Sequence, residues 1–137
     1  MKRVVMDTNS LVSAIGWEGP PHRILQACLR GQLELYVSPA ILRELTEVLA
    51  RPKLRVVAEH PDLTIVLSWL YQPVRLVIPR IELSVVEDDP DDNRVVECAV
   101  EAGAEAVVTG DTHLLHLGHY QEIVFLRPHE ACSRWGF

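Results

Sequence analysis

The chain has 137 residues, enough to bury a hydrophobic core, and its length predicts a single domain over residues 1–137. Hydrophobic residues make up 48% and charged residues 23%, with no low-complexity tract, which excludes a disordered chain. The net charge of −6 argues against a general polyanion binder, unless divalent cations occupy some of the acids. No apolar run is long enough to span a bilayer, so no membrane partner is expected.

The sequence also predicts a cytoplasmic location. The apolar stretch near the N-terminus meets Asp7 too early for a signal peptide. Cys28, Cys98 and Cys132 are widely spaced in apolar surroundings without a CxxC pair. We therefore expect reduced cysteines in helices or in the core.

In chain order, short apolar runs predict strands and amphipathic runs predict helices. Strands are expected at 2–6, 33–37, 74–79, 104–110 and 122–126. Helices are expected at 10–15, 21–31, 38–51, 62–72, 91–103, 111–118 and 128–135. Ser38 and Pro39 form a helix start signal, and Gly103 a helix end. This alternation predicts an α/β fold, a sandwich around a central, mostly parallel sheet.

Two predicted strands are followed by an acid. Asp7 comes after the strand 2–6, and Asp111 comes after the strand 104–110. Each is compatible with a purely structural role as a helix N-cap. Ligands of parallel sheets bind beyond the carboxyl ends of the strands, so the two acids together also indicate a site at that edge.

Helical phase places Asp92 on the inward face of its helix. At about 100° per residue it shares the stripe of Val95 and Val96. Arg94, Glu97 and Glu101 fall on the opposite face, which we expect to be solvated. Asp91 or Asp92 alone would suffice as the helix cap, so the surplus acids at the start of this helix need another explanation.

Glu44 lies on the border of the buried stripe of its helix, beside Ile41 and Val48. It is either a solvated residue whose stem covers the core, or an acid that reaches the edge of the sheet. Four carboxylates in one place would repel strongly, by about 4 kcal/mol per pair at roughly 4 Å and an effective dielectric near 20. Oxygen ligands without Cys or His suit a hard cation such as Mg²⁺ or Mn²⁺. The pattern therefore predicts a metal site that serves phosphate chemistry.

Three segments carry a resemblance to a known family: "VVMDTNSLVSA", "SPAILRELTEVLARPK" and "DPDDNRVVECAVEAGAEAVVTGD". In this order they resemble the PIN-domain family over nearly the whole chain, and most closely its VapC-like toxins of toxin–antitoxin systems. The resemblance implies a three-layer α/β/α sandwich and a Mg²⁺- or Mn²⁺-dependent endoribonuclease. It further implies an RNA substrate cut to a 5′-phosphate and a 3′-hydroxyl, and an antitoxin partner. The aromatic residues at 69–71 leave a homodimer open as well.

The family's acidic quartet corresponds here to four residues, as catalytic groups and metal ligands: Asp7, Glu44, Asp92 and Asp111. The family's small polar position beside the first acid matches Thr8 or Asn9, and Thr109 falls where the family often carries a hydroxyl. Asp89 and Asp91 are either substitutes for a further acid of the family or simple helix-entry residues. Many relatives have a further acid two residues after Asp111, where this chain has His113. A second metal that relies on that acid is therefore in doubt.

Weaker patterns leave alternatives open. The basic segment 51–55 indicates either an RNA phosphate contact or a solvated helix end. His113, His116 and His119 suggest a transition-metal site or, more simply, helix-end residues. The aromatic residues within segments 69–71 and 135–137 belong either to the core or to an interface.

Two rival functions remain at the sequence level. A Mg²⁺-dependent phosphatase of the haloacid-dehalogenase type also uses an Asp after the first strand, but it would need an acid where Asn9 stands. A non-catalytic PIN-fold module that binds RNA or protein would not need all four acids. Neither rival is favoured by the residues.

Overall fold

The computed structural model describes all residues, 1–137. It contains five strands, eight α-helices and two short 3₁₀ helices. The strands are β1 (Arg3–Met6), β2 (Glu34–Tyr36), β3 (Ala106–Val108), β4 (His119–Tyr120) and β5 (Ile123–Leu126). The α-helices are α1 (Thr8–Gly16), α2 (Pro20–Leu29), α3 (Pro39–Leu49), α4 (Arg55–Ala58), α5 (Leu63–Leu70), α6 (Pro90–Ala102), α7 (Thr112–Leu117) and α8 (Pro128–Trp135). The 3₁₀ helices are η1 (Pro52–Leu54) and η2 (Pro73–Arg75).

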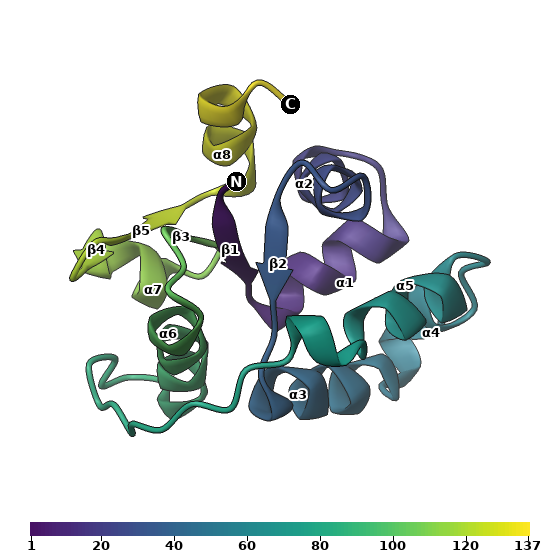
Figure 1. The fold of residues 1–137 in the computed structure, drawn as a ribbon. Coiled ribbons are helices and arrows are strands. Elements are labelled where there is room, and N and C mark those ends of the chain that lie inside the picture. Colours follow the sequence, from purple (N-terminus) through teal and green to yellow (C-terminus); the bar gives the residue numbers. More distant parts are fainter.

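The five strands form one sheet in the order β2-β1-β3-β5-β4 (Figure 1). All neighbours are parallel except β4 and β5, which form a short antiparallel pair. Val4, Val5 and Met6 are fully buried, as expected for a strand covered on both faces. The predicted mostly parallel sheet is therefore confirmed.

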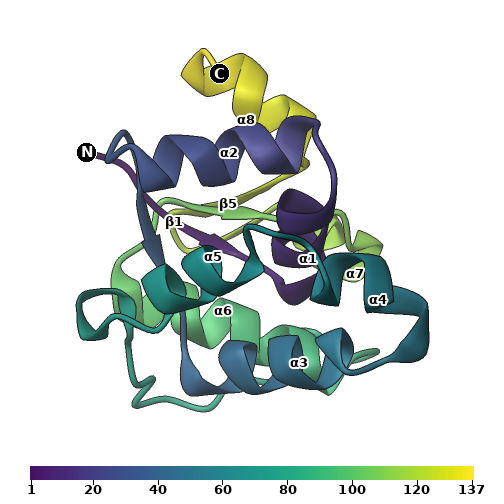
Figure 2. The same ribbon diagram turned by 90° about the vertical axis from the view of Figure 1, so that its right-hand side faces the viewer.

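Helices cover both faces of this sheet. Figure 2 shows α2 and α8 on one side and α6 and α3 on the other, with the strands between them. The inward faces of these helices and the strands share one hydrophobic core. The three-layer α/β/α arrangement predicted from the sequence is confirmed.

The helix boundary signals act as expected. The Ser38 hydroxyl accepts the N–H of Ile41 at 3.4 Å, and Pro39 is the first residue of α3. Gly103 ends α6 with a φ of 63°, a left-handed conformation that favours glycine. In α6, however, the N-cap is neither Asp91 nor Asp92, because the Asp89 carboxylate accepts the N–H of Asp91 at 3.0 Å.

The predicted strand 74–79 is wrong. Residues 73–75 form η2, and only one bridge, between Val37 and Leu76, joins the following segment to the sheet. Pro79 cannot donate to a ladder, and Ile78 is largely exposed, so this run lacks the partner and the burial that a central strand needs.

Residues 80–86 instead run along α6, which supplies hydrogen-bond partners from its side chains. The backbone N–H groups of Arg80, Leu83 and Val86 donate to Glu101, Glu97 and Asn93, respectively, at 2.7–3.0 Å. Each of these three α6 residues is four positions from the next, so they lie on one face of the helix. The expectation that Glu97 is solvated is therefore wrong: the residue is buried beneath this segment.

The sequence also missed two short elements, α4 and β4. Both are too short to carry a recognisable hydrophobic period. None of the helices combines the length and the apolar character that crossing a membrane would require.

Candidate metal centre

Asp7 follows β1 and begins α1. Its Oδ1 accepts the backbone N–H of Ser10 at 2.9 Å, which makes Asp7 the N-cap of that helix. Its Oδ2 accepts a short hydrogen bond from the hydroxyl of Thr109. Asp7 is buried, so both oxygens are held in fixed directions by protein groups.

The register of the sheet explains why Thr109 lies beside Asp7. Met6 at the end of β1 pairs with Val108 at the end of β3, so the next residues of the two strands are neighbours. The Thr109 hydroxyl also accepts the backbone N–H of Asp111 at 2.9 Å. One buried hydroxyl thus positions two acids that follow different strands.

Asp111 is the N-cap of α7. Its Oδ1 accepts the N–H groups of His113 at 2.8 Å and Leu114 at 3.4 Å. The structural role expected for Asp7 and Asp111 is thus present in both. It does not explain why the two carboxylates share one edge of the sheet.

Asp92, in the first turn of α6, points inward as its helical phase predicted. The residue is 8% exposed, and its Oδ2 is fully buried without a hydrogen-bond partner. A buried carboxylate oxygen without a donor is costly, so this atom indicates a missing partner. Asp89, the cap of α6, lies beside it.

Glu44, from α3, is half-buried and faces the same group of acids. Burial raises the pKa of Glu44, and the neighbouring charges of Asp91, Asp7 and Asp89 raise it further. The Thr8 hydroxyl lies close enough to oppose this pKa rise, although it forms no hydrogen bond of regular geometry. Of the two readings left open for Glu44, the structure favours a side chain that reaches the edge of the sheet.

The electrostatics of the cluster are unfavourable for several charged carboxylates at once. Burial raises the pKa of Asp92 to about 7, with further contributions from the charges of Asp111, Asp89 and Asp7. Burial also raises the pKa of Asp7, although the hydrogen bonds from Ser10 and Thr109 act in the opposite direction. Either some of these groups hold protons or a cation neutralises them.

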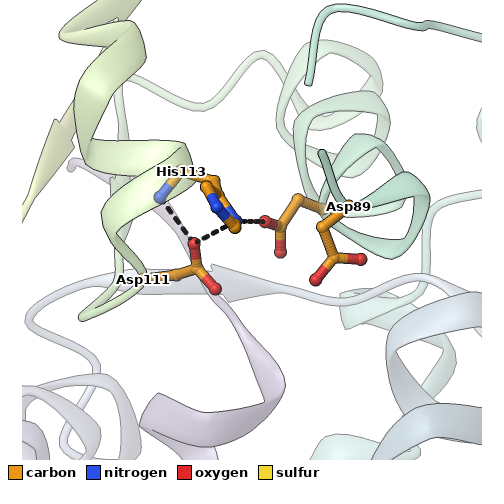
Figure 3. Close-up of side chains that lie close together, drawn as sticks. Asp89, Asp111 and His113 are labelled. Atoms are coloured by element: carbon orange, nitrogen blue, oxygen red, sulfur yellow. Dashed lines mark hydrogen bonds and ion pairs between the residues drawn. The ribbon is translucent and has the colours of Figure 1, made fainter. Parts of the chain in front are cut away.

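His113 adds an imidazole to the acids. Figure 3 shows Asp111 and His113 at the start of α7 pointing toward Asp89 at the start of α6. One ligand atom from each of four side chains lies within 4.8 Å of the others: Asp89, Asp92, Asp111 and His113. The sequence identified His113 as a departure from the acidic pattern and as one of three histidines in a row, and did not place it with the acids, because nothing in the spacing of residues shows the direction of its ring.

These residues fit a divalent cation. The group combines carboxylate oxygens with one imidazole nitrogen, and the orphaned Asp92 oxygen lacks the positive partner that an ion would supply. Of the acids expected from the sequence, Asp92 and Asp111 belong to this group, and Asp7 is near enough to raise the pKa of Asp92. Glu44 lies near Asp7, Asp89 and Asp91, and neither Asp7 nor Glu44 is part of the group of four. The roles of all the expected acids as metal ligands remain predictions.

Residues 3–113 match the protein family described as the PIN domain. The match covers well over half of the chain. The chain belongs to the PIN-domain family. PIN domains are generally metal-dependent nucleases, which agrees with an acidic cluster at the edge of the sheet.

The chain is also similar in sequence to a curated protein. The chain is 32% identical over 117 residues to the uncharacterized protein MJ1680 of Methanocaldococcus jannaschii. The alignment covers 84% of this chain and 74% of that relative.

The remaining candidate residues surround the site of this PIN domain or lie away from it. Asn9 and Asp91 are exposed, and Asp91 contributes to the field at Glu44. His116 and His119 are exposed and take no part in a metal-ligating group, so the three histidines do not form one site. The basic segment 51–55 spans η1 and the start of α4, where Arg55 pairs with Glu59 in solvent.

A cavity of about 280 Å³ beside β2 offers no comparable chemistry. Its lining is mostly apolar, and the Arg75 guanidinium stacks on the ring of Trp69 at 3.6 Å. Burial raises the pKa of the Cys28 thiol at its wall to about 12, which makes it unsuitable as a nucleophile. The three cysteines are free and buried, as the sequence predicted.

Proposed function

We propose that this PIN domain is a Mg²⁺- or Mn²⁺-dependent endoribonuclease. The observation that carries the proposal is the buried Asp92 oxygen, which has no hydrogen-bond partner and lies among the acids at the ends of β1 and β3. A structural cap needs one carboxylate, whereas this edge gathers several that repel one another. A bound divalent cation would balance them.

In this proposal Asp7, Asp92 and Asp111 hold the ion. Asp7 is fixed by Ser10 and Thr109, so it presents its carboxylate without a rotamer change. When bound, a divalent cation polarises a phosphoryl oxygen and lowers the pKa of a water ligand.

Glu44 acts beside these ligands. Its raised pKa makes its carboxylate a better proton acceptor than an ordinary glutamate. We assign it to orient the attacking water and to take its proton. The water oxygen bonds to phosphorus while the bond from phosphorus to the 3′ oxygen breaks. The 3′ oxygen takes a proton from solvent, which yields a 5′-phosphate and a 3′-hydroxyl.

Cleavage of single-stranded RNA with Mn²⁺ tests this function. Asp7→Asn and Asp111→Asn remove a charge while an N-cap side chain remains, because Asn caps helices about as well as Asp. Both variants should lose cleavage by a factor of at least about 10². Asp62→Asn, an exposed acid before α5 whose side chain makes no cap hydrogen bond, is the matched control and should cleave normally.

The same assay separates RNA from DNA, with a single-stranded DNA of identical sequence as the second substrate. Undiminished RNA cleavage by both Asp7→Asn and Asp111→Asn would end the assignment of the acids. Cleavage of the DNA at an equal rate would leave a nuclease but reject the RNA preference.

We further propose that the protein is the toxin of a toxin–antitoxin pair. Exposed apolar residues support a protein partner, since an interface covers such side chains from water. Six fall within residues 65–81, from α5 to the segment beside α6: Ile65, Tyr71, Val74, Leu76, Ile78 and Ile81.

Co-expression tests this role. A short reading frame beside the gene should encode a protein that forms a stable complex and suppresses cleavage. Light scattering on the purified chain distinguishes a complex with a second protein from a homodimer. A homodimer would show twice the chain mass of 15.5 kDa with no other protein present. The toxin role would be contradicted if the chain is a monomer and no neighbouring gene restores the growth of cells that express it. The nuclease proposal would remain intact.

A further inference from the structure

His113 is held over the acidic cluster by the start of α7. Asp111 accepts the backbone N–H of His113, which fixes the first turn of the helix. The next residue, Leu114, is fully buried and anchors that turn to the core. The His113 side chain is 43% exposed, and its ring lies toward the acids.

The two ring nitrogens face different groups. Nδ1 lies 4.0 Å from Asp92 Oδ2 and 3.7 Å from Asp111 Oδ1. Nε2 lies 4.0 Å from Asp88 Oδ2, on the solvent side. These distances are too long for hydrogen bonds, so no direct bond accounts for the arrangement.

The same distances suit atoms that surround one ion. Ligands at about 2.1 Å from a cation lie up to about 4.2 Å from each other. Both distances from Nδ1 are below this 4.2 Å separation. The ligand atoms of Asp89, Asp92, Asp111 and His113, which lie within 4.8 Å of one another, would need only small side-chain movements to satisfy it. The orphaned atom, Asp92 Oδ2, is one of the two oxygens that Nδ1 faces.

Asp88 supplies a further argument. A histidine that binds a metal through one nitrogen usually donates its other N–H to a carboxylate, which fixes the tautomer. The exposed Asp88 side chain, with its Oδ2 4.0 Å from Nε2, needs only a small rotation to accept this N–H, while Nδ1 faces Asp92 and Asp111.

We propose that Nδ1 of His113 is a ligand of the ion held by Asp92 and Asp111, and that it makes the centre prefer divalent transition metals over Mg²⁺. The proposal rests on the proposed function, because the same carboxylates hold the ion. Imidazole nitrogen suits transition metals, whereas Mg²⁺ takes oxygen ligands almost exclusively. The centre therefore selects Mn²⁺ and its neighbours by ligand type.

Mn²⁺ electron paramagnetic resonance tests this without an activity assay. Titration gives the Kd for Mn²⁺, competition gives the Kd for Mg²⁺, and the spin-echo spectrum shows whether nitrogen is bonded to the ion. The proteins are the full-length chain, His113→Asp, which replaces nitrogen by oxygen at the same position, and His116→Gln, an exposed histidine of the same helix.

The unmodified protein and His116→Gln should show nitrogen coupling and bind Mn²⁺ at least tenfold more tightly than Mg²⁺. His113→Asp should lose the coupling and reduce the ratio of the two Kd values by about tenfold. Asp88→Asn should retain the coupling and weaken Mn²⁺ binding, since the tautomer is less well fixed.

The failures are distinguishable. Mn²⁺ binding by the unmodified protein without nitrogen coupling overturns the role of His113 and leaves the carboxylate centre standing. An unchanged ratio of Kd values in His113→Asp likewise overturns it, because the ring would then act only as a nearby charge. No Mn²⁺ binding at millimolar concentration overturns the proposed metal centre, and His113 as a ligand with it.

Discussion

Thr109 at the end of β3 donates a hydrogen bond to the carboxylate of Asp7 at the end of β1, although 102 positions separate the two residues. The same hydroxyl accepts the N–H of Asp111. The fully buried Thr109 is therefore the connection that sets the relative positions of two acids from neighbouring strands.

Replacement of this hydroxyl by a methyl group should disturb both acids. Thr109→Val keeps the shape but leaves one Asp7 oxygen and the Asp111 N–H without partners, which should reduce the free energy of unfolding by about 1–3 kcal/mol. The misplaced carboxylates should slow RNA cleavage by about tenfold or more.

Urea denaturation and the cleavage assay measure the two effects. Thr109→Ser is the matched control, because it restores the hydroxyl and should recover most of the cleavage rate. Normal cleavage by Thr109→Val would mean that the hydroxyl does not position the site.

The sequence was sufficient to locate this edge of the sheet. Asp7 and Asp111 follow apolar strands, and the carboxyl ends of parallel strands meet, so their proximity follows from local patterns and one topological rule. The inward direction of Asp92 follows from helical phase in the same way. These features depend on the residue's own element and on the order of the strands.

The rest depends on tertiary contacts that no local pattern contains. Glu97 has the phase of an exposed residue, but the segment 80–86 covers it because that segment takes its hydrogen bonds from α6 and not from the sheet. The ring of His113 turns toward Asp92, which is 21 positions earlier and on another helix. Such features are set by which segments pack together.

The charge of Asp92 should destabilise the metal-free protein. In EDTA at pH 8, above the pKa of about 7, Asp92→Asn removes a buried carboxylate that faces other acids. The Tm should therefore rise, by about 3–5 °C for each kcal/mol of relieved repulsion in a chain of this size.

With Mg²⁺ or Mn²⁺ present, the unmodified protein should have a higher Tm than Asp92→Asn, the reverse of the order in EDTA. Millimolar metal should raise the Tm of the unmodified protein and leave that of Asp92→Asn nearly unchanged. Differential scanning fluorimetry with and without EDTA measures both effects, with Asp62→Asn as the control. If metal stabilises Asp92→Asn as strongly as the unmodified protein, Asp92 is not a ligand.

The same group predicts a pH dependence with a definite sign. The folded-state pKa of Asp92 is about 7, above its ordinary value of 3.8. Between these values the folded protein binds more protons than the unfolded chain, so its stability falls as the pH rises. In EDTA, the Tm of the unmodified protein should drop relative to Asp92→Asn from about pH 4 to about pH 7, and the difference should then level off.

Thermal unfolding at half-unit pH intervals measures this difference, in which the titrations common to both proteins cancel. With Mn²⁺ present the trend should invert, because the ion binds only the ionised carboxylate. A difference that is independent of pH would mean that Asp92 titrates alike in the folded and unfolded chains.

Glu97 and Glu101 allow the covering segment to be tested with a matched pair. Glu97 is buried and accepts both the N–H of Leu83 and the guanidinium of Arg94 at 2.7 Å. Glu101 binds Arg80, whose side chain is 86% exposed. Glu97→Ala removes the ion-pair partner of the partly buried Arg94 guanidinium and leaves the Leu83 N–H unpaired, and should lower the free energy of unfolding by about 2–3 kcal/mol. Glu101→Ala should lower the Tm less than Glu97→Ala, since the exposed Arg80 stays in contact with solvent when the pair is lost.

Metal affinity extends this test to the site. Residues 83–88 lead directly to Asp89, so loosening them in Glu97→Ala should weaken Mn²⁺ binding in the titration as well as stability. Glu101 contacts the far end of the segment, at Arg80, so Glu101→Ala should bind Mn²⁺ normally. Equal loss of affinity in both variants would mean that the segment moves as one unit. Normal affinity in Glu97→Ala would mean that the cap of α6 fixes Asp89 without help from the covering segment.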